Sequence, residues 1–350
     1  MTKIPDDIKK LSFEKAMEEL SEIVENLESG NIDLEKSIEY YTRGSQLRAH
    51  CQQKLDNAVL KLEEIKVLPD GKISKKKKMK HQIINNDLKK FTIKFNKFLK
   101  KKLSKDKNLL NQAILYSINT GGKRFRPYLV YIFGKELNLS NSVIFNLASA
   151  IEMLHNYSLV HDDLPSMDND QFRRGKKTTH YKFNEYTAIL AGCALLTKAY
   201  QILSSSSFKI SDKKKTKLIE VMSKVSGEKG LLLGQYYDLS LKSPTVSGRL
   251  ELNKLKTAKL MSYCCQAVAI CANKNKSVEV SMKKIGEYIG EIFQINDDFA
   301  DFPRMSKVNT EILLNYKKKL AEKTIKNLKK IKLKKKKTFL LIDFLVDLKV

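Results

Sequence analysis

Apolar residues near the start of the chain recur at alternating steps of four and three positions. They are Phe13, Met17, Leu20, Val24 and Leu27. This spacing is typical of a helix whose apolar seam packs against another helix. Ser12 is placed to cap the start of this helix, and Gly30 is placed to end it.

A second helix is predicted to begin near Asp33. Its apolar positions are Leu34, Ile38, Tyr41, Leu47, Cys51, Leu55, Ala58, Leu62 and Ile65. Residues 12–65 therefore predict an antiparallel helical hairpin, in which carboxylates alternate with lysines and His50 is the one histidine. Two helices bury little surface alone, so the long seam indicates a partner, either a second copy or another coiled-coil protein.

A turn and a run of lysines follow the hairpin. The turn is Val67-Leu68-Pro69-Asp70-Gly71-Lys72, and Ser74-Lys75-Lys76-Lys77-Lys78 comes after it. Met79 opens a new stretch rich in helix signals and without alternating strand patterns, much as the first residue of an independent protein would. We expect an all-α protein with a hairpin at 1–68, a linker at 69–80 and a larger helical domain at 81–350.

The net charge of +27 comes almost entirely from lysine, because only eight of the 66 basic residues are arginine. Four of those arginines stand in two short motifs, as Arg124, Arg126, Arg173 and Arg174. Lysine suits any solvated surface, whereas the planar arginine fork binds phosphate with two hydrogen bonds. The charge thus favours a lysine-rich composition with anion sites in the arginine motifs, and direct DNA binding is a weaker alternative.

The cysteines and the apolar runs of the sequence indicate the cellular compartment in which the protein is expected. The five cysteines, Cys51, Cys193, Cys264, Cys265 and Cys271, have no metal-type spacing and an odd count, which favours a reducing cytoplasm. The sequence shows no apolar run of about 18 residues, and its polar start does not resemble a signal peptide. We therefore expect a soluble cytoplasmic protein without a membrane span.

Two acidic clusters lie far apart in the larger domain. They are Asp162-Asp163-Leu164-Pro165-Ser166-Met167-Asp168 and Asp297-Asp298-Phe299-Ala300-Asp301. Like charges one turn apart on a helix, such as Asp297 and Asp301, are disfavoured unless a cation compensates them. Pro165 is expected to end a helix and let Asp168 fold back towards Asp162. Carboxylates that hold magnesium leave coordination positions free for phosphate oxygens, so the clusters predict magnesium-dependent diphosphate chemistry.

Three further motifs are weak singly. The turn Gly121-Gly122-Lys123-Arg124-Phe125-Arg126-Pro127 suits phosphate, but a basic loop is more often only solvated. Lys256-Thr257 and Gly234-Gln235-Tyr236-Tyr237-Asp238 fit helix packing equally well. Their order along the chain closely resembles that of the short-chain trans-prenyl diphosphate synthases, and the likeness covers about residues 80–350. The same order includes residues 152–168, Arg173-Arg174-Gly175, Ala188-Ile189-Leu190-Ala191-Gly192 and Phe293-Gln294.

The resemblance implies an isoprenoid-synthase-type helical bundle that condenses isopentenyl diphosphate with an allylic diphosphate. It implies three magnesium ions held by Asp162, Asp168 and Asp297, with weaker contributions from Asp163, Asp298 and Asp301. The implied catalytic residues are Asp162, Asp168, Arg173 and Lys256. Isopentenyl diphosphate would be held by Lys123, Arg126, His155 and Arg174, and the allylic partner by Arg173, Lys256, Thr257 and Gln294. A homodimer through this domain is also implied.

Product length in this family depends on side-chain bulk just before the first acidic cluster. Tyr157 would form a floor for the growing tail, and Ser158 leaves room for a moderate one. This pattern is similar to bacterial farnesyl diphosphate synthases, with geranyl and geranylgeranyl products left open.

The chain departs from the family pattern in several places. Cys193, Ala258 and Lys177 stand where the family usually has aspartate, glycine and proline. After Asp301 about two dozen residues of a lysine-bearing loop are missing, although Arg304 or Lys307 could substitute for its cation. The alternative interpretation is that the shortened synthase is inactive and only the hairpin functions.

The hairpin resembles the small subunit of exodeoxyribonuclease VII over about residues 10–66. The likeness lies in Leu11-Ser12-Phe13-Glu14-Lys15-Ala16, Leu27-Glu28-Ser29-Gly30, Leu34-Glu35-Lys36-Ser37 and Cys51-Gln52-Gln53-Lys54-Leu55. It implies a non-catalytic module that binds the large nuclease subunit and meets DNA only indirectly. Whether the linker is processed is left open.

Overall fold

The computed structural model describes residues 5–28, 33–64, 75–104, 106–240, 248, 251–252, 254–301 and 307–347. Contacts divide the chain into two compact units, Met1–Lys78 and Met79–Val350. Each unit is described by itself.

The first unit is a helical hairpin. A short helix α1 (Asp6–Lys10) precedes the two long helices α2 (Phe13–Glu28) and α3 (Leu34–Glu64), which pack on each other. The backbone N–H of Lys15 donates to Ser12 Oγ at 3.2 Å, and that of Lys36 donates to Asp33 Oδ1 at 2.8 Å. Both predicted N-caps are therefore present, whereas Gly30 lies outside the described residues.

The buried face of α2 differs from the predicted seam. Ala16 and Ile23 are buried, whereas Met17 and Val24 are 40% and 44% exposed. The buried stripe follows the helical period through positions 13, 16, 20, 23 and 27, because α1 and α3 both cover this side, where Ile8, Leu47 and Cys51 complete the core. On α3, the predicted seam residues Ile38 and Tyr41 also face solvent, at 60% and 73% exposure.

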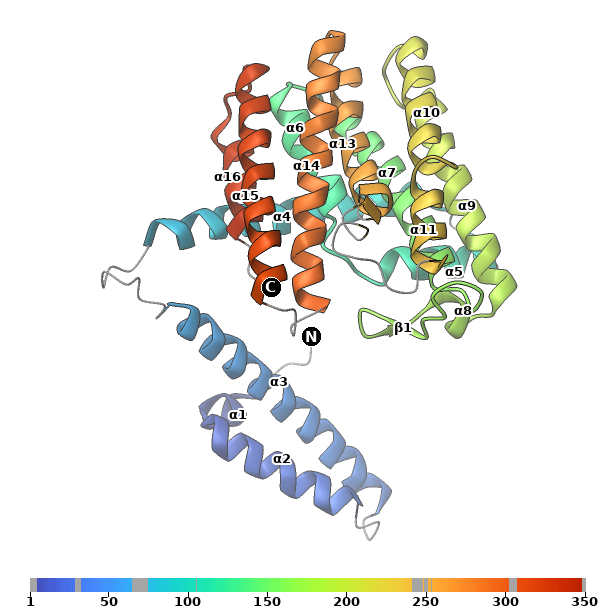
Figure 1. Ribbon diagram of the computed structural model, residues 1–350. Helices are drawn as coiled ribbons and strands as arrows, with labels where there is room; N and C mark the ends of the chain where they lie inside the picture. The colour runs from blue at the N-terminus through green and yellow to red at the C-terminus, as the bar shows by residue number, and fades with distance from the viewer. Residues whose placement is uncertain are drawn as a thin grey trace. The chain divides into compact units, whose positions relative to one another are not determined.

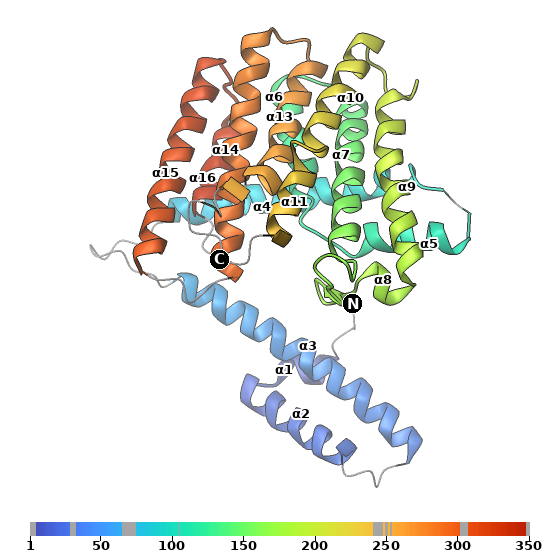
Figure 2. The ribbon, with the colours of Figure 1, turned by 45° about the vertical axis from the view of Figure 1, so that its right-hand side comes forward.

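The second unit is a bundle of helices, as expected. They are α4 (Lys75–Lys100), α5 (Leu109–Asn119), α6 (Phe125–Glu136), α7 (Asn141–Asp162), α8 (Thr179–Lys182), α9 (Glu185–Ser204), α10 (Asp212–Ser226), α11 (Leu231–Ser240), η1 (Lys254–Ala258), α13 (Lys259–Cys271), α14 (Lys276–Asp301), α15 (Lys307–Lys330) and α16 (Lys336–Asp347). The most extensive packing joins α7 to α9, α13 to α14 and α14 to α15. Figures 1 and 2 show α13, α14 and α15 running side by side, with α4 crossing the bundle.

One large apolar core fills the bundle. Along α7 and α13 nearly every turn contributes buried side chains, because each of these helices is covered by neighbours on several sides. Among the described helices, α9 is long and apolar enough to cross a membrane by length and composition, with a mean hydropathy of 1.3. It packs closely on α7 and α5, which accounts for the apolar residues on its buried side, and 44% of its apolar window is buried.

A two-stranded ribbon is the one piece of sheet in the described part of the chain. Strand β1 (Phe172–Arg173) pairs antiparallel with β2 (Lys176–Lys177). Arg174 and Gly175 join them with φ of +54° and +71°, as a two-residue hairpin turn requires. This turn fixes the directions of Arg173 and Arg174.

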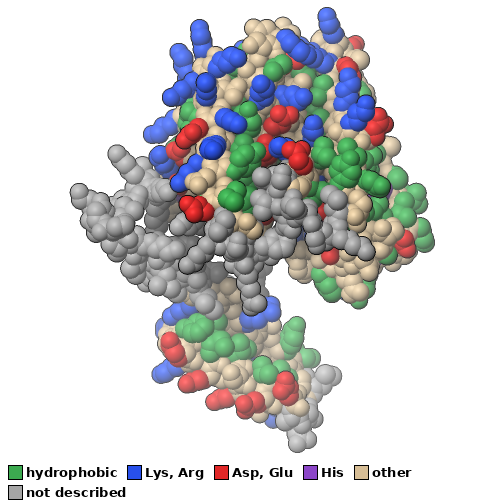
Figure 3. All heavy atoms as spheres, viewed as in Figure 1, with side chains coloured by type: hydrophobic (Ala, Val, Ile, Leu, Met, Phe, Trp, Pro, Cys, Tyr) green, Lys and Arg blue, Asp and Glu red, His purple; other side chains and the backbone are tan. Residues whose placement is uncertain are grey.

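Charged side chains are spread over the face of the bundle that Figure 3 shows. In the view of Figure 3, lysine and arginine side chains are scattered across the bundle with carboxylates among them, and they do not form one continuous basic stripe. This distribution fits the interpretation of the charge as a general property of the composition.

Candidate active site

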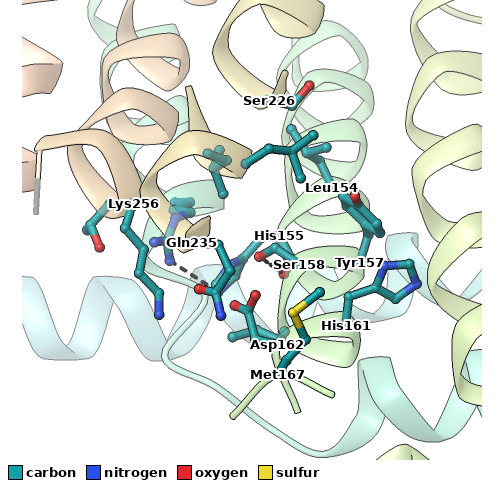
Figure 4. A pocket seen from close by; sticks show the side chains of 15 residues that line it. Leu154, His155, Tyr157, Ser158, His161, Asp162, Met167, Ser226, Gln235 and Lys256 are labelled. Atoms are coloured by element: carbon teal, nitrogen blue, oxygen red, sulfur yellow. Dashed lines mark hydrogen bonds between the residues drawn. The ribbon is translucent and has the colours of Figure 1, made fainter. Parts of the chain in front are cut away.

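A cavity of about 160 Å³ lies inside the bundle. Its lining combines polar and apolar side chains. Polar groups come from Arg126, His155, Asp162, Gln235, Lys256 and Thr257, and the apolar wall includes Leu154, Tyr157, Leu231 and Leu232. Figure 4 shows Lys256 and Gln235 on one side, Tyr157 and His161 on the other, and Asp162 between them. Such a cavity can hold a ligand with a charged head and an apolar tail.

The first acidic cluster lies where α7 ends. The helix stops at Asp162, and the backbone N–H of Asp168 donates to the Asp162 carbonyl oxygen at 2.9 Å. The chain therefore folds back on itself in the way predicted around Pro165. Gln235 Nε2, from α11, donates to Asp168 Oδ1 at 3.2 Å, which links the cluster to a second helix.

Burial changes the acidity of two carboxyls in this cluster. It raises the pKa of Asp162 to about 7, opposed in part by the Lys256 ammonium. Burial also raises the pKa of Asp163 to about 6, even though Arg173 Nε donates to Asp163 Oδ1 at 2.6 Å. Carboxyls held out of water in this way gain from a cation that stabilises their ionised form.

Arg173 and Arg174 point to different groups. Arg173 pairs with Asp163 and also donates from Nη2 to Asp170 Oδ2 at 3.2 Å. Arg174 Nη1 donates to the Gly121 carbonyl oxygen at 2.6 Å, and a Cβ on Gly122 would lie 2.5 Å from the same nitrogen. The glycine pair therefore allows Arg174 to lie against the basic turn, where Lys123 is exposed.

Arg126 and His155 lie together in the lining of the cavity. Arg126 Nη1 donates to His155 Nε2 at 3.1 Å. Burial and the nearby Arg126 guanidinium lower the pKa of His155 well below its usual value, so the ring is neutral at pH 7 and can accept this bond. Arg126 Nε is buried and has no hydrogen-bond partner in the described structure. A buried donor of this kind suits an anionic ligand.

Lys256 and Thr257 lie on the π-helical segment η1. Lys256 Nζ pairs with Asp238 of α11, and Thr257 Oγ1 donates to Gln294 Oε1 at 2.7 Å. A Cβ on Gly234 would lie 2.7 Å from the Lys256 backbone nitrogen, so α11 can approach η1 only through this glycine. A single π-helical turn is common at functional sites because it redirects the side chains it carries.

The second acidic cluster is carried by α14. Gln294 Nε2 donates to Asp298 Oδ1 at 3.2 Å, and the charge of Asp297 acts on Arg126. The side chain of Asp301 and residues 302–306, including Arg304, lie outside the described residues. Within the described ranges, no three His, Cys, Asp or Glu side chains form a group that could hold a metal ion unaided.

The structure thus brings several predicted site residues together and places others beside them. Arg126, His155, Asp162, Lys256 and Thr257 line the cavity, whereas Lys123, Asp168, Arg173, Arg174, Gln294 and Asp297 are not among its lining residues. Sequence reasoning gave no role to Gln235, whose Oε1 is buried without a partner in the described structure, or to Asp238. Both stand in the motif at 234–238, whose position in the chain was the available signal.

The two units resemble two different known families. The Polyprenyl synthetase family matches residues 107–314, and the Exonuclease VII small subunit family matches residues 13–64. A farnesyl diphosphate synthase of Haemophilus influenzae is 41% identical over 196 residues, covering 55% of this chain and 66% of that protein. One of Buchnera aphidicola subsp. Acyrthosiphon pisum is 38% identical over 245 residues, covering 68% of this chain and 87% of that protein.

Two solved structures share the fold of the bundle. An FPP/GFPP synthase from Zymomonas mobilis is similar with a TM-score of 0.69 and 29% identity, covering 76% of this chain and 98% of that one. A geranyltransferase from Legionella pneumophila is similar with a TM-score of 0.67 and 29% identity, covering 77% and 96%. With the family match spanning more than half of its length, this chain belongs to the polyprenyl synthetase family.

Proposed function

We propose that the bundle is a farnesyl diphosphate synthase-type prenyltransferase, which condenses isopentenyl diphosphate with dimethylallyl or geranyl diphosphate. The observation that carries the proposal is the cavity, whose lining combines Asp162, Lys256 and Arg126 with apolar side chains and Tyr157. The names of the similar proteins and the shared fold support this chemistry.

The donor set near the cavity fits magnesium. Asp162, Asp168 and Asp297 offer carboxylate oxygens, the ligands this cation prefers, and diphosphate oxygens would complete the coordination of the three ions we propose. The raised pKa of Asp162 supports this assignment, because an ionised carboxylate in a buried place needs a compensating charge. Bound magnesium would neutralise the diphosphate leaving group.

Cationic and neutral polar side chains would together bind the two diphosphates. We assign Lys123, Arg126, His155 and Arg174 to isopentenyl diphosphate, and Arg173, Lys256, Thr257 and Gln294 to the allylic substrate. The buried Arg126 Nε supports the first assignment. For the second, the chain of bonds from Thr257 through Gln294 to Asp298 holds these side chains in fixed orientations beside Lys256. A cation and hydrogen-bond donors held in fixed orientations stabilise developing negative charge on a leaving group.

The protein incubated with magnesium, isopentenyl diphosphate and geranyl diphosphate tests this proposal. We expect farnesyl diphosphate to form, and Asp162→Asn to lower the rate by on the order of 10²–10³-fold, the loss typical of removing one electrostatic contact to the transition state. Asp212→Asn is the matched control, since that side chain is 94% exposed on α10. Absence of product from the unchanged protein would instead support a hairpin-only function.

We further propose that the hairpin binds the large subunit of exodeoxyribonuclease VII and meets DNA only through it. The family match over residues 13–64 supports this, and so does the apolar surface of Met17, Val24, Ile38 and Tyr41, which the hairpin core leaves exposed. Interface aromatic residues often dominate binding, so Tyr41→Ala should weaken binding about tenfold or more.

Titration of the full chain against the purified large subunit measures this affinity. Glu35→Gln is the control, because Glu35 is also exposed on α3 but carries no apolar surface. Equal affinities for the unchanged protein and Tyr41→Ala would exclude this surface as the docking site.

The bundle is also proposed to form a homodimer. Tyr186 and Leu190 of α9 and Tyr181 of α8 are 65%, 52% and 44% exposed, which gives a second copy an apolar surface to cover. Sedimentation velocity on the full chain tests this: a monomer at micromolar concentration would contradict it.

A further inference from the structure

Two aromatic rings on one helix line the cavity at the side away from Lys256 (Figure 4). Tyr157 and His161 are four residues apart on α7, and both line the cavity. Their ring centroids lie 4.8 Å apart with an interplanar angle of 68°, an edge-to-face contact. Figure 4 shows the two side chains together at the side of the cavity away from Lys256. We call this part of the lining the end wall; it is formed by both rings and not by Tyr157 alone.

The imidazole of His161 is held by a second helix. Its Nε2 lies 3.1 Å from the Ile189 carbonyl oxygen of α9. A carbonyl oxygen can only accept, so Nε2 carries the proton and donates this bond. The bond fixes the plane of the His161 ring relative to α9.

Gly192 makes this position of the ring available. A Cβ on Gly192 would lie 2.2 Å from His161 Nε2 and 2.3 Å from Cδ2, so no other residue type fits here without moving the ring. Gly192 is buried and lies one turn after Ile189 on the same face of α9. The ring thus contacts α9 at the Ile189 carbonyl oxygen and at Gly192, and it contacts Tyr157 on α7, while it stays partly exposed.

We propose that His161 is a positioning residue that holds Tyr157 in the end wall and thereby sets the length of the prenyl tail. This assignment rests on the proposed prenyltransferase function. Without the imidazole, Tyr157 would lose its edge-to-face partner and the space behind it would open to a longer tail. An imidazole displaced from α9 would move towards the cavity that it already lines, which would shorten the chamber.

Two variants therefore have opposite expected effects on the products. His161→Ala should raise the ratio of geranylgeranyl to farnesyl diphosphate about tenfold, which corresponds to about 1.4 kcal/mol in the relative barriers. Gly192→Ala should instead move the products towards geranyl diphosphate. Thr197→Ala is the control on the same helix, because that side chain is exposed and lies outside the cavity lining.

The measurement is the distribution of chain lengths from dimethylallyl and isopentenyl diphosphates with the full chain, alongside thermal unfolding of each variant. Opposite shifts in the two variants support the assignment, and if Gly192→Ala does not fold, His161→Ala decides alone. A product distribution equal to that of Thr197→Ala, or a lower rate without a change in chain length, overturns it. Failure of the unchanged protein to make any product removes the proposed function, and this assignment with it.

Discussion

One arginine in each unit joins segments that are distant in sequence, and the two arginines differ in burial. Arg124 of the bundle is 4% exposed and pairs with Glu152, and it also donates to Asn96 and to the Ile118 carbonyl oxygen. Arg43 of the hairpin is 34% exposed and pairs with Asp7 and Glu19. Both are pairs of an arginine with carboxylates, so burial decides whether losing the pair costs much or little free energy of unfolding.

The carboxyls of the two units show the same contrast. A hydrogen bond from Arg43 lowers the pKa of Asp7 on the hairpin surface, so that carboxylate stays ionised and hydrated. In the bundle, burial raises the pKa of Asp162 to about 7. Ligand binding can change the protonation state of a buried carboxyl, because its charge is costly without a partner. This difference explains why the candidate catalytic residues lie in the bundle, while the hairpin offers a docking surface.

Breaking the buried pair should have the largest effect. Glu152→Gln leaves the Arg124 guanidinium in the core without its counter-charge, and we expect the bundle to lose about 3–5 kcal/mol of unfolding free energy. Urea denaturation followed by circular dichroism measures this loss. The control is Glu220→Gln, which breaks an exposed pair with Lys224 on α10 and should cost less than about 0.5 kcal/mol. Similar losses in the two variants would contradict the role given to burial.

A second buried cation, Lys317, allows the effect of burial to be tested by changing the pH. Burial lowers the pKa of Lys317 to about 8, opposed by Asp347, and its Nζ donates to Asn296 Oδ1. The unfolded chain keeps the ordinary lysine pKa near 10.5, so between pH 8 and 10 it binds more protons than the folded one, and the Lys317 contribution to stability rises with pH.

Relative to Lys317→Met, the unchanged protein should therefore gain about 1 kcal/mol between pH 7 and pH 9. Urea unfolding of both proteins at each pH measures the gain, and their difference cancels the titration of the buried cysteines. A difference that does not change with pH would show that Lys317 keeps an ordinary acidity in the folded bundle.

The sequence predicted the features that depend on local pattern. The all-α class, the hairpin with caps at Ser12 and Asp33, and the turn of the first acidic cluster all follow from spacing and capping rules. The motif residues that line the cavity, such as Arg126 and Asp162, were found because the family motifs keep their order along the chain.

Features set by packing between distant segments could not be predicted in this way. Met17 and Val24 fit a seam by spacing, but the position of α1 and α3 turned Ala16 and Ile23 inwards instead. Arg124 shares a motif with Arg126, yet it takes a left-handed backbone conformation and is used inside the core. In both cases the deciding contact comes from another helix, and the spacing of residues along one helix cannot predict that contact.

The smallest expected effect on stability is that of removing the exposed ion pairs of the hairpin. Arg43→Met removes both hairpin ion pairs, but water solvates Asp7 and Glu19 once the guanidinium is gone, and the methionine stem keeps part of the packing. Hydrogen exchange of the α3 amides in the full chain should report a loss below about 1 kcal/mol. Leu47→Ala, which empties a fully buried position of the hairpin core, should cost about 2–5 kcal/mol by the same measurement. If Arg43→Met cost as much as Leu47→Ala, the surface pairs would hold the hairpin together as firmly as Arg124 and Glu152 hold the bundle, and burial would no longer distinguish the two units.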